Sequence, residues 1–370
     1  MSDASVVSLV QYLLDQAVSK GASDIHFEPY QHSYRVRLRL DGILQPLVIP
    51  ATEITNQLSA QISARLKVLA KLDITERRLP QDGRFIFTHS ESQNRDCRIN
   101  TCPTLFGEKI VIRILDTHKA SLDVNQLGMD TLQKQHFLNS IQKPQGMLMI
   151  TGPTGSGKTV SLYTALNALN HPSKNISTVE EPIEIHLDGI NQIDINIKIG
   201  LDYTSALRGL LRQDPDVIMI GEIRDQETAK IAIQAAQTGH LVLASLHTNS
   251  AIESLSRLSN LGISGFNIAS SVTLIIAQRL IRKLCPHCKK SDHSAVGCSQ
   301  CAQGYQGRLG VFEIMPLSAT LRSMLIANQS IQDIYKQACK EGFRSLYESA
   351  LDKVNQGLTS MAEVHRVISA

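Results

Sequence analysis

The sequence predicts an α/β fold for the C-terminal part of the chain, preceded by a smaller α+β domain. From residue 146 onward, short apolar runs such as "GMLMIT" and "HLVLASLH" alternate with helical segments such as "TVSLYTALNAL", which is typical of a mostly parallel sheet covered by helices on both faces. Nearer the start, the alternating segment "YRVRLRLDGIL" contains an Asp-Gly pair that indicates a hairpin. A length of 370 residues with 42% hydrophobic content is enough for two such cores.

The domain boundaries follow the same patterns. Residues 1–118 open with a helical segment and continue with strands, and residues 119–135 contain turn residues with little strand character, so they are expected to form a linker. The second domain is expected to span residues 136–370, with a cysteine-rich module at 282–305 and amphipathic helices at 317–370. The basic run "RLIRKL" before the first cysteines is expected to be helical.

Composition and charge narrow the classes of function. The net charge of +3 and the pI near 8.4 fall short of the concentrated basic surface of nucleic-acid binders. No segment approaches 18 uninterrupted apolar residues, and the first residues lack the basic start of a secretion signal. We therefore expect a cytoplasmic protein with no transmembrane segment and no direct nucleic-acid partner. Seven cysteines, four of them in two C-x-x-C pairs, favour a bound metal over disulfides.

The segment "GPTGSGKT" matches the phosphate-binding pattern G-x-x-x-x-G-K-[ST]. It lies between an apolar strand and a helix, which is the context that this pattern requires. Its glycines allow a tight loop with inward-pointing amides, and the helix N-terminus adds positive potential. Lys158 is expected to reach the β- and γ-phosphates of ATP, and Thr159 to bind Mg²⁺. The predicted nucleotide-binding residues are Gly152, Pro153, Thr154, Gly155, Ser156, Gly157, Lys158 and Thr159.

Further polar candidates follow the next apolar strands. Glu222 ends "DVIMIGE" and is the candidate second acid on the magnesium side, because ligands bind at the carboxyl ends of parallel strands. Glu180 and Glu181 in "TVEEPIE" follow a strand that is expected to lie beside the phosphate-loop strand, and either carboxylate could activate the attacking water. His247 in "ASLHTNSA" could sense the γ-phosphate, with a purely structural histidine as the alternative.

The two C-x-x-C pairs are separated by nine residues and consist of Cys285, Cys288, Cys298 and Cys301. Four thiolates favour a structural zinc ion, and a closed ligand set leaves no position for a substrate. An isolated redox pair is the alternative.

Taken together, "GPTGSGKT", "TVEEPIE", "LRQDPDVIMIGEIRD", "TGHLVLASLHTNSA" and "CPHC…CSQC" resemble the type II secretion and type IV pilus assembly ATPases. Upstream, "GASDIHFEP", "ARLKVLAKLDITERRLPQDGRF" and "RINTCPTLFGEKIVIRIL" look like that family's second N-terminal domain, so the resemblance covers about residues 8–370. It implies a RecA-like C-terminal domain joined flexibly to a PAS-like N-terminal domain. The family's first N-terminal domain has no counterpart in this sequence, which would fit either a native short form or a shortened version of a longer chain.

The resemblance also implies a mechanism. A hexamer would bind ATP in the cleft between the two domains, and domain closure would be the power stroke. Glu180 would activate water, Glu222 would take the Walker B role, and His247 would lie near the γ-phosphate. The positions that match the family's phosphate-binding arginines are Arg98, Arg113, Arg208 and Arg212.

In the same family, the four-cysteine module belongs to ATPases that assemble pili or secretion pseudopili. The implied partners are an inner-membrane platform protein and a membrane-anchored recruitment protein, which would hold the chain at the inner membrane. Three features depart from the family: Glu180-Glu181 replaces Glu-Asp, "ASLHTNSA" replaces "STLHTNDA", and the cysteine pairs lie closer together. Two alternatives remain, a DNA-uptake or conjugation motor and a weakly hydrolysing, nucleotide-bound scaffold.

Overall fold

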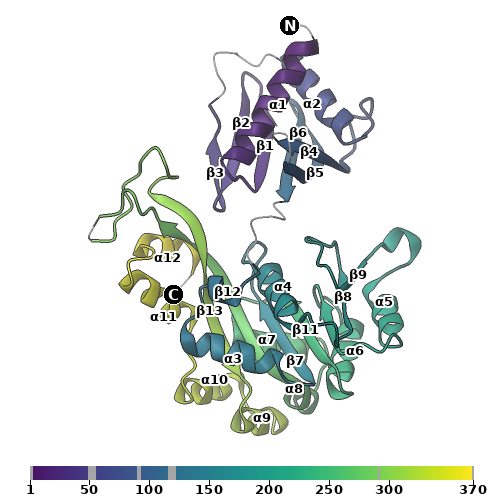
Figure 1. Cartoon of the computed structure of the whole chain (residues 1–370), viewed down its shortest axis with the longest axis vertical. Coiled ribbons are helices and arrows are strands. Elements are labelled where there is room, and N and C mark those ends of the chain that lie inside the picture. Colours follow the sequence, from purple (N-terminus) through teal and green to yellow (C-terminus); the bar gives the residue numbers. More distant parts are fainter. Residues whose placement is uncertain (1–2, 49–55, 90–92, 116–121, 291, 369–370) are drawn as a thin grey trace. The chain divides into compact units, whose positions relative to one another are not determined.

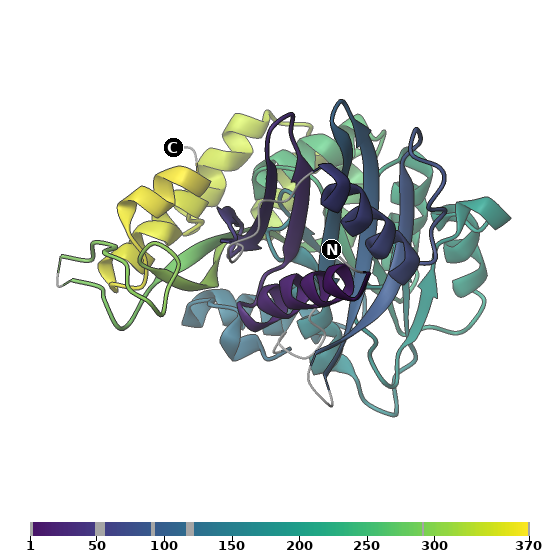
Figure 2. The same cartoon turned by 90° about the horizontal axis from the view of Figure 1, so that it is seen from above.

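The chain divides into two units, Met1–Lys119 and Ala120–Ala370, each with its own hydrophobic core. This computed structural model describes residues 3–48, 56–89, 93–115, 122–290 and 292–368. Figures 1 and 2 show the helices and strands of both units, which are described one at a time below.

The N-terminal unit has one six-stranded sheet in the order β3-β2-β1-β6-β5-β4, with antiparallel neighbours throughout. Its strands are β1 (Asp24–Pro29), β2 (Tyr34–Leu40), β3 (Ile43–Pro46), β4 (Gln81–His89), β5 (Gln93–Thr104) and β6 (Gly107–Leu115). Helices α1 (Asp3–Ser19) and α2 (Asn56–Leu69) supply the rest of the core. The predicted Asp-Gly hairpin is present between β2 and β3, with φ of 48° at Asp41 and 87° at Gly42.

The C-terminal unit contains a seven-stranded sheet in the order β13-β12-β7-β11-β10-β8-β9, in which β13 alone is antiparallel to its neighbour. Its strands are β7 (Gly146–Thr151), β8 (Ile176–Glu180), β9 (Asn191–Asp194), β10 (Val217–Ile220), β11 (Leu241–Leu246), β12 (Val272–Leu284) and β13 (Tyr305–Pro316). Its helices are α3 (Thr131–Ile141), α4 (Lys158–Leu169), α5 (Tyr203–Leu210), α6 (Gln226–Gln237), α7 (Ala251–Asn260), α8 (Gly265–Ser271), α9 (Ala319–Ile326), α10 (Ile331–Lys340), α11 (Leu346–Asn355) and α12 (Met361–Val367), with short 3-10 turns at Val124–Gln126 and Ile197–Ile199.

Helices cover both faces of this sheet. Met147 and Met149 of β7 belong to a core shared with α6, α7 and α8, whereas Leu148 and Ile150 belong to a second core shared with α3 and α4. Because successive residues of a strand point to opposite faces, a strand buried on both sides must be apolar throughout. The apolar runs therefore correctly predicted the α/β arrangement.

The hairpin of β12 and β13 differs from the prediction. The run "RLIRKL" at 279–284, expected to be helical, forms the second half of β12. Pairs such as Arg279 with Val311 and Ile281 with Leu309 keep this run extended. The preceding segment "VTLII" is rich in β-branched residues, which favour a strand, and pairing with β13 continues that strand toward the cysteines.

Candidate nucleotide site and candidate metal centre

The carboxyl ends of four parallel strands meet at one edge of the C-terminal sheet. The phosphate loop follows β7, Glu222 follows β10, His247 follows β11, and the pair Glu180-Glu181 lies at the end of β8. The expectation that β8 lies beside β7 is wrong, because β11 and β10 lie between them. After β7, helix α4 leads to β8, and the two positions between these strands are taken by β10 and β11, which come later in the sequence. Since all four strands run in the same direction, their ends still share one edge.

Glycines hold the phosphate loop close to β12. Gly152 and Gly157 have φ of 151° and 90°, conformations that side chains disfavour. A Cβ added at Gly152 would lie 2.6 Å from the carbonyl oxygen of Gln278, and one at Gly157 would lie 2.8 Å from Gln278 Nε2. The loop can therefore keep its position at the N-terminus of α4 only with glycine at both places. This is the geometry of a phosphate cradle.

Lys158 folds back over this loop. Its Nζ donates hydrogen bonds to the carbonyl oxygens of Gly152 and Pro153 at 2.8 and 3.2 Å. Burial lowers the pKa of Lys158 to about 8; Glu222 opposes this shift, and Arg279 adds to it. A phosphate group in the cradle would offer the ammonium group charged acceptors in place of two carbonyls, so the lysine fits the predicted ligand.

Thr159 and Glu222 are the two residues predicted to hold magnesium. Thr159 is exposed at the start of α4, and three residues earlier the buried Ser156 Oγ has no hydrogen-bond partner among the described residues. Glu222 Oε2 lies 3.1 Å from His247 Nε2, and Arg224 binds the other carboxylate oxygen. Burial raises the pKa of Glu222, but Arg224 and His247 more than offset this and leave it below its usual value. The carboxylate is therefore ionised, as a magnesium ligand must be.

The two adjacent glutamates at the end of β8 have different surroundings. Glu180 is only 3% exposed, and its carboxylate accepts hydrogen bonds from Thr178 Oγ1 at 2.6 Å, from Gln192 Nε2 at 3.1 Å and from the Tyr163 hydroxyl. Glu181 is more exposed and lies 3.1 Å from Arg224 Nη1. Because residues of a strand alternate in direction, Glu180 turns toward α4 while Glu181 joins the ion-pair cluster around Glu222.

The four predicted arginines fall into two pairs, one in each unit. Arg98 and Arg113 lie directly opposite each other on β5 and β6 of the N-terminal unit. Arg208 lies in the last turn of α5 and pairs with Glu227 at 2.6 Å, and Arg212 follows two residues after the helix and donates to the Arg208 carbonyl at 2.8 Å.

Sequence reasoning missed two arginines near the same edge. Arg224 binds both Glu181 and Glu222, and its position two residues after Glu222 was the signal available in the sequence. Arg279 donates to the Asn249 carbonyl at 2.9 Å. It was hidden by the helical interpretation of its segment. As a strand residue it continues β12 past the pair of Ala277 with Thr151, and so lies alongside the phosphate loop.

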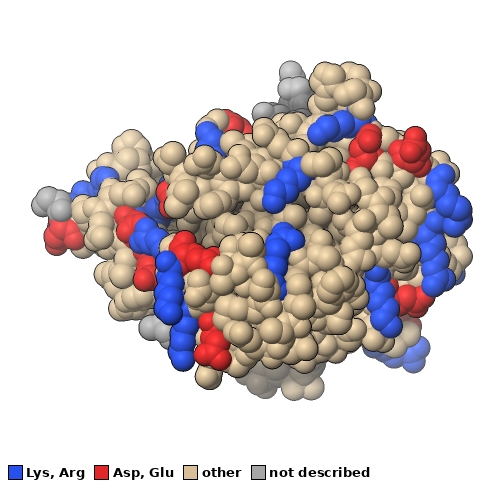
Figure 3. Space-filling view, turned by 90° about the horizontal axis from the view of Figure 1, so that it is seen from below, with Lys and Arg blue, Asp and Glu red and all other residues tan. Residues whose placement is uncertain are grey.

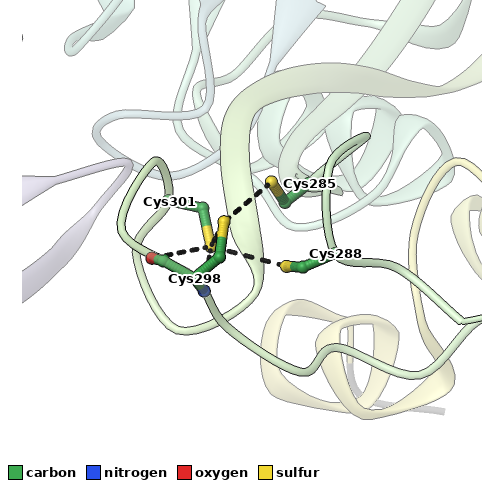
Figure 4. Close-up of side chains that lie close together, drawn as sticks. All are labelled: Cys285, Cys288, Cys298 and Cys301. Carbon is green, nitrogen blue, oxygen red and sulfur yellow. Dashed lines mark hydrogen bonds between the residues drawn. The ribbon is translucent and has the colours of Figure 1, made fainter.

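The four cysteines of the two C-x-x-C pairs come together at the tip of the β12–β13 hairpin (Figure 4). Their sulfur atoms all lie within 4.8 Å of one another, and Cys285–Cys298 and Cys288–Cys301 are 3.9 and 3.7 Å apart. Four thiolates bound to one zinc ion at about 2.3 Å would be separated by roughly 3.8 Å in a tetrahedron. The cluster therefore fits a structural zinc ion.

A phosphate loop followed by a helix, with an ionised glutamate and a histidine at the same edge of a parallel sheet, defines a P-loop nucleotide-binding protein. Comparison of the whole sequence with known protein families narrows this class to one family. The chain belongs to the type II/IV secretion system protein family, whose model matches residues 1–366.

Two relatives agree with this membership, and one solved structure shares the fold. The type IV pilus assembly ATPase PilB of Pseudomonas aeruginosa is 51% identical over 387 residues, covering 99% of this chain and 68% of that protein. The type II secretion system ATPase E of Vibrio cholerae is 41% identical and covers 99% of this chain and 76% of its own length. The structure of the Legionella pneumophila ATPase DotB has the same fold, with a TM-score of 0.74, 21% identity, and coverage of 96% of this chain and 93% of that one. Within the described ranges, none of the helices combines the length and apolar character of a membrane span.

Proposed function

We propose that this chain hydrolyses ATP with Mg²⁺ and uses the energy to assemble a type IV pilus or a type II secretion pseudopilus. The observation that carries the proposal is the edge of the C-terminal sheet, where the glycine cradle, Lys158 and Glu222 lie together. The 51% sequence identity to a type IV pilus assembly ATPase, over 99% of this chain, supports pilus or pseudopilus assembly as the work that the energy drives.

In this proposal the chain's own residues bind, orient and activate. Loop amides and Lys158 hold the phosphates, while Thr159 and Glu222 hold the magnesium ion, which neutralises charge on the phosphates when it is bound. Glu180 orients the attacking water and accepts its proton, and the three donors around its carboxylate fix its position. One observation favours Glu181 as the alternative base, because Arg224 joins Glu181 and Glu222 in one cluster.

Hydrolysis would be coupled to closure of the two domains within a ring of subunits. We propose that six copies form a ring, that the N-terminal unit is PAS-like, and that Arg98 and Arg113 reach the phosphates when a domain closes. Arg208 and Arg212 would contact phosphates once their present partners are released. His247, already bonded to Glu222, would report on the γ-phosphate. Guanidinium groups carried by a moving domain stabilise developing charge only in the closed state, so hydrolysis would be tied to motion.

The proposed partners are a membrane platform protein and a recruitment protein, which place the chain in the cytoplasm at the inner membrane. We further propose that the cysteine module binds zinc and helps to contact these partners. A DNA motor is less favoured: on the face shown in Figure 3, basic and acidic side chains lie near one another between large uncharged areas, rather than in one basic strip.

The test is to measure ATP turnover of the purified chain with and without candidate activators. Stimulation by the membrane platform protein in vesicles, with no effect of single- or double-stranded DNA, is the expected result. Stimulation by DNA alone would favour the translocation motor. Nucleotide binding without measurable turnover under either condition would favour the scaffold.

A further inference from the structure

A chain of three hydroxyl groups joins the strand before the phosphate loop to the loop that carries His247. Thr151, the last residue of β7, is fully buried, and its Oγ1 lies 2.7 Å from Thr248 Oγ1. Thr248 Oγ1 lies 2.8 Å from the Oγ of Ser254, a buried residue of α7. Each hydroxyl can donate to the next, and Ser254 Oγ then donates to the Ser250 carbonyl at 3.3 Å. The chain is therefore satisfied from one end to the other.

The Thr151 hydroxyl continues the connection between β7 and β11 beyond their last backbone pair. The two strands run in parallel up to the pair of Thr151 with Leu246, after which they lead into different loops. Gly152, which begins the phosphate loop, has φ of 151°, which is not a strand conformation. The backbone N–H of Thr248 donates to Thr151 Oγ1 at 2.9 Å. One side chain thus holds together two loops that the sheet no longer joins.

Two further contacts fix the rest of the loop that carries His247. Arg279 Nη2 donates to the Asn249 carbonyl at 2.9 Å. The buried Glu313 carboxylate accepts a hydrogen bond at 2.6 Å from the backbone N–H of Ala251, the first residue of α7. By contrast, the side chain of His247 is 47% exposed. The loop is therefore a fixed support, and the imidazole ring is the part of it that a ligand can reach.

We propose that Thr151 is a positioning residue, whose hydroxyl makes His247 follow the phosphate loop. The catalytic consequence rests on the proposed function, whereas the link itself rests on the contacts described above. Thr151 directly precedes Gly152, so a phosphate group that displaces the loop also displaces the Thr151 hydroxyl. Through Thr248 this displacement reaches His247 and changes its distance from Glu222. The imidazole therefore takes different positions with ATP and with ADP.

The first experiment measures ATP turnover of the full chain with Thr151→Val, Thr151→Ser and the control Thr164→Val. Valine has the shape of threonine without the hydroxyl, whereas serine keeps the hydroxyl. Thr164 is a fully buried threonine of α4 whose hydroxyl donates to the Val160 carbonyl of the same helix at 2.7 Å. Thr151→Val should lower kcat by about 10- to 100-fold with a smaller effect on KM, because a misplaced group can cost about 10²-fold. Thr151→Ser and Thr164→Val should stay close to the wild-type kcat.

Thermal melting separates positioning from loss of structure. Thr151→Val leaves the backbone N–H of Thr248 without its acceptor, so its Tm should fall, and turnover is measured per folded protein well below the Tm of every variant. Thr164→Val also loses one buried hydroxyl and shows what such a loss alone does to turnover. An equal fall of kcat in Thr151→Ser, or in Thr164→Val, would overturn the proposal.

A double-mutant cycle tests whether Thr151 acts through His247. If it does, adding Thr151→Val to His247→Ala should change kcat by no more than about 2-fold, because the group that it positions is already absent. Losses that multiply in the double variant would show that the two residues act independently and would overturn the proposal.

The second experiment compares the binding of ADP and of a non-hydrolysable ATP analogue by titration calorimetry. The wild type should distinguish the two ligands, and both Thr151→Val and His247→Ala should bring the ratio of their Kd values closer to one. The affinity for ADP should change little in either variant, because the phosphate loop keeps all of its residues. Equal ratios in all three proteins would contradict the link.

The outcomes also separate this proposal from the proposed function. If Lys158→Ala abolishes turnover but Thr151→Val leaves it unchanged, the inference fails and the proposed function stands. If the wild type has no turnover but Thr151→Val removes its discrimination between ADP and the analogue, the proposed function fails and the link stands.

Discussion

Replacing Glu180 by glutamine tests the hydrogen-bond network at the end of β8. The carboxylate accepts from Thr178, Gln192 and Tyr163, and the Tyr163 hydroxyl in turn accepts from the backbone N–H of Glu184 at 3.2 Å. Burial raises the pKa of the Tyr163 hydroxyl, so it remains a donor. A glutamine has one carbonyl oxygen for three donors, so at least one of them must face an amide N–H.

The expected cost can be worked from this geometry. Losing one hydrogen bond to a charged group costs about 1.5–3 kcal/mol. For a unit of this size, each kcal/mol lowers Tm by about 2–4 °C, so Glu180→Gln should melt roughly 3–12 °C below the wild type. If Glu180 also activates water, kcat should fall by about 10²-fold or more. Differential scanning calorimetry and a phosphate-release assay measure the two effects separately.

Glu181→Gln is the matched control, because it changes the adjacent residue from the same acid to the same amide. Its ion pair with Arg224 is partly exposed, so its loss should cost no more than about 1 kcal/mol and change kcat by only a few-fold. An unchanged Tm for Glu180→Gln would refute the network argument. A large loss of kcat in Glu181→Gln with near-normal turnover in Glu180→Gln would assign water activation to Glu181.

Metal analysis should find about one zinc ion per chain, and Cys298→Ser should remove it; a folded protein without bound metal would contradict the four-cysteine centre. Glu363 is 1% exposed and accepts two hydrogen bonds from the Arg282 side chain, at 2.8 and 3.0 Å. Glu363→Ala should leave this buried guanidinium unpaired, destabilise the unit by about 3–5 kcal/mol and lower the Tm measured by calorimetry. A Tm shift of less than about 2 °C would show that the pair is dispensable. The pKa of Lys158 is lowered to about 8, and the charged form of the lysine is the one that binds phosphate. Nucleotide affinity should therefore be greatest below pH 8 and should weaken as the pH rises through 8. Equal affinities in titration calorimetry at pH 7 and pH 9 would contradict this expectation.

Local patterns were sufficient to predict several parts of the molecule. The apolar segment "GMLMIT" predicted a strand buried on both faces, which β7 is, and the glycines after it predicted a loop. The glycine pattern therefore predicted that Lys158 begins the helix after this loop, as it does in α4. The Asp-Gly pair at 41 and 42 specified its hairpin in the same way, because both residues must adopt positive φ. The cysteine spacing predicted a cluster whose geometry depends on only one short loop.

Features that depend on contacts distant in sequence could not be predicted in this way. The strand order, which separates β8 from β7, depends on where later strands enter the sheet. The segment at 279–284 is a strand because it pairs with β13, from Arg279 with Val311 to Leu284 with Tyr305, and without that partner its pattern also fits a helix. The same error hid Arg279. The different surroundings of Glu180 and Glu181 follow from the end of β8, where element boundaries are least certain in sequence.

The most direct test of the account compares steady-state ATP hydrolysis by the wild-type chain with that of Lys158→Ala and Glu222→Gln, using folded proteins of equal Tm and saturating Mg²⁺. The account predicts measurable turnover in the wild type and a loss of about 10²-fold or more in each variant. Lys158→Ala removes the cation of the phosphate loop, and Glu222→Gln removes the ionised acid at the same edge of the sheet. Equal turnover in all three proteins would contradict the claim that this edge of the sheet is where ATP is cleaved.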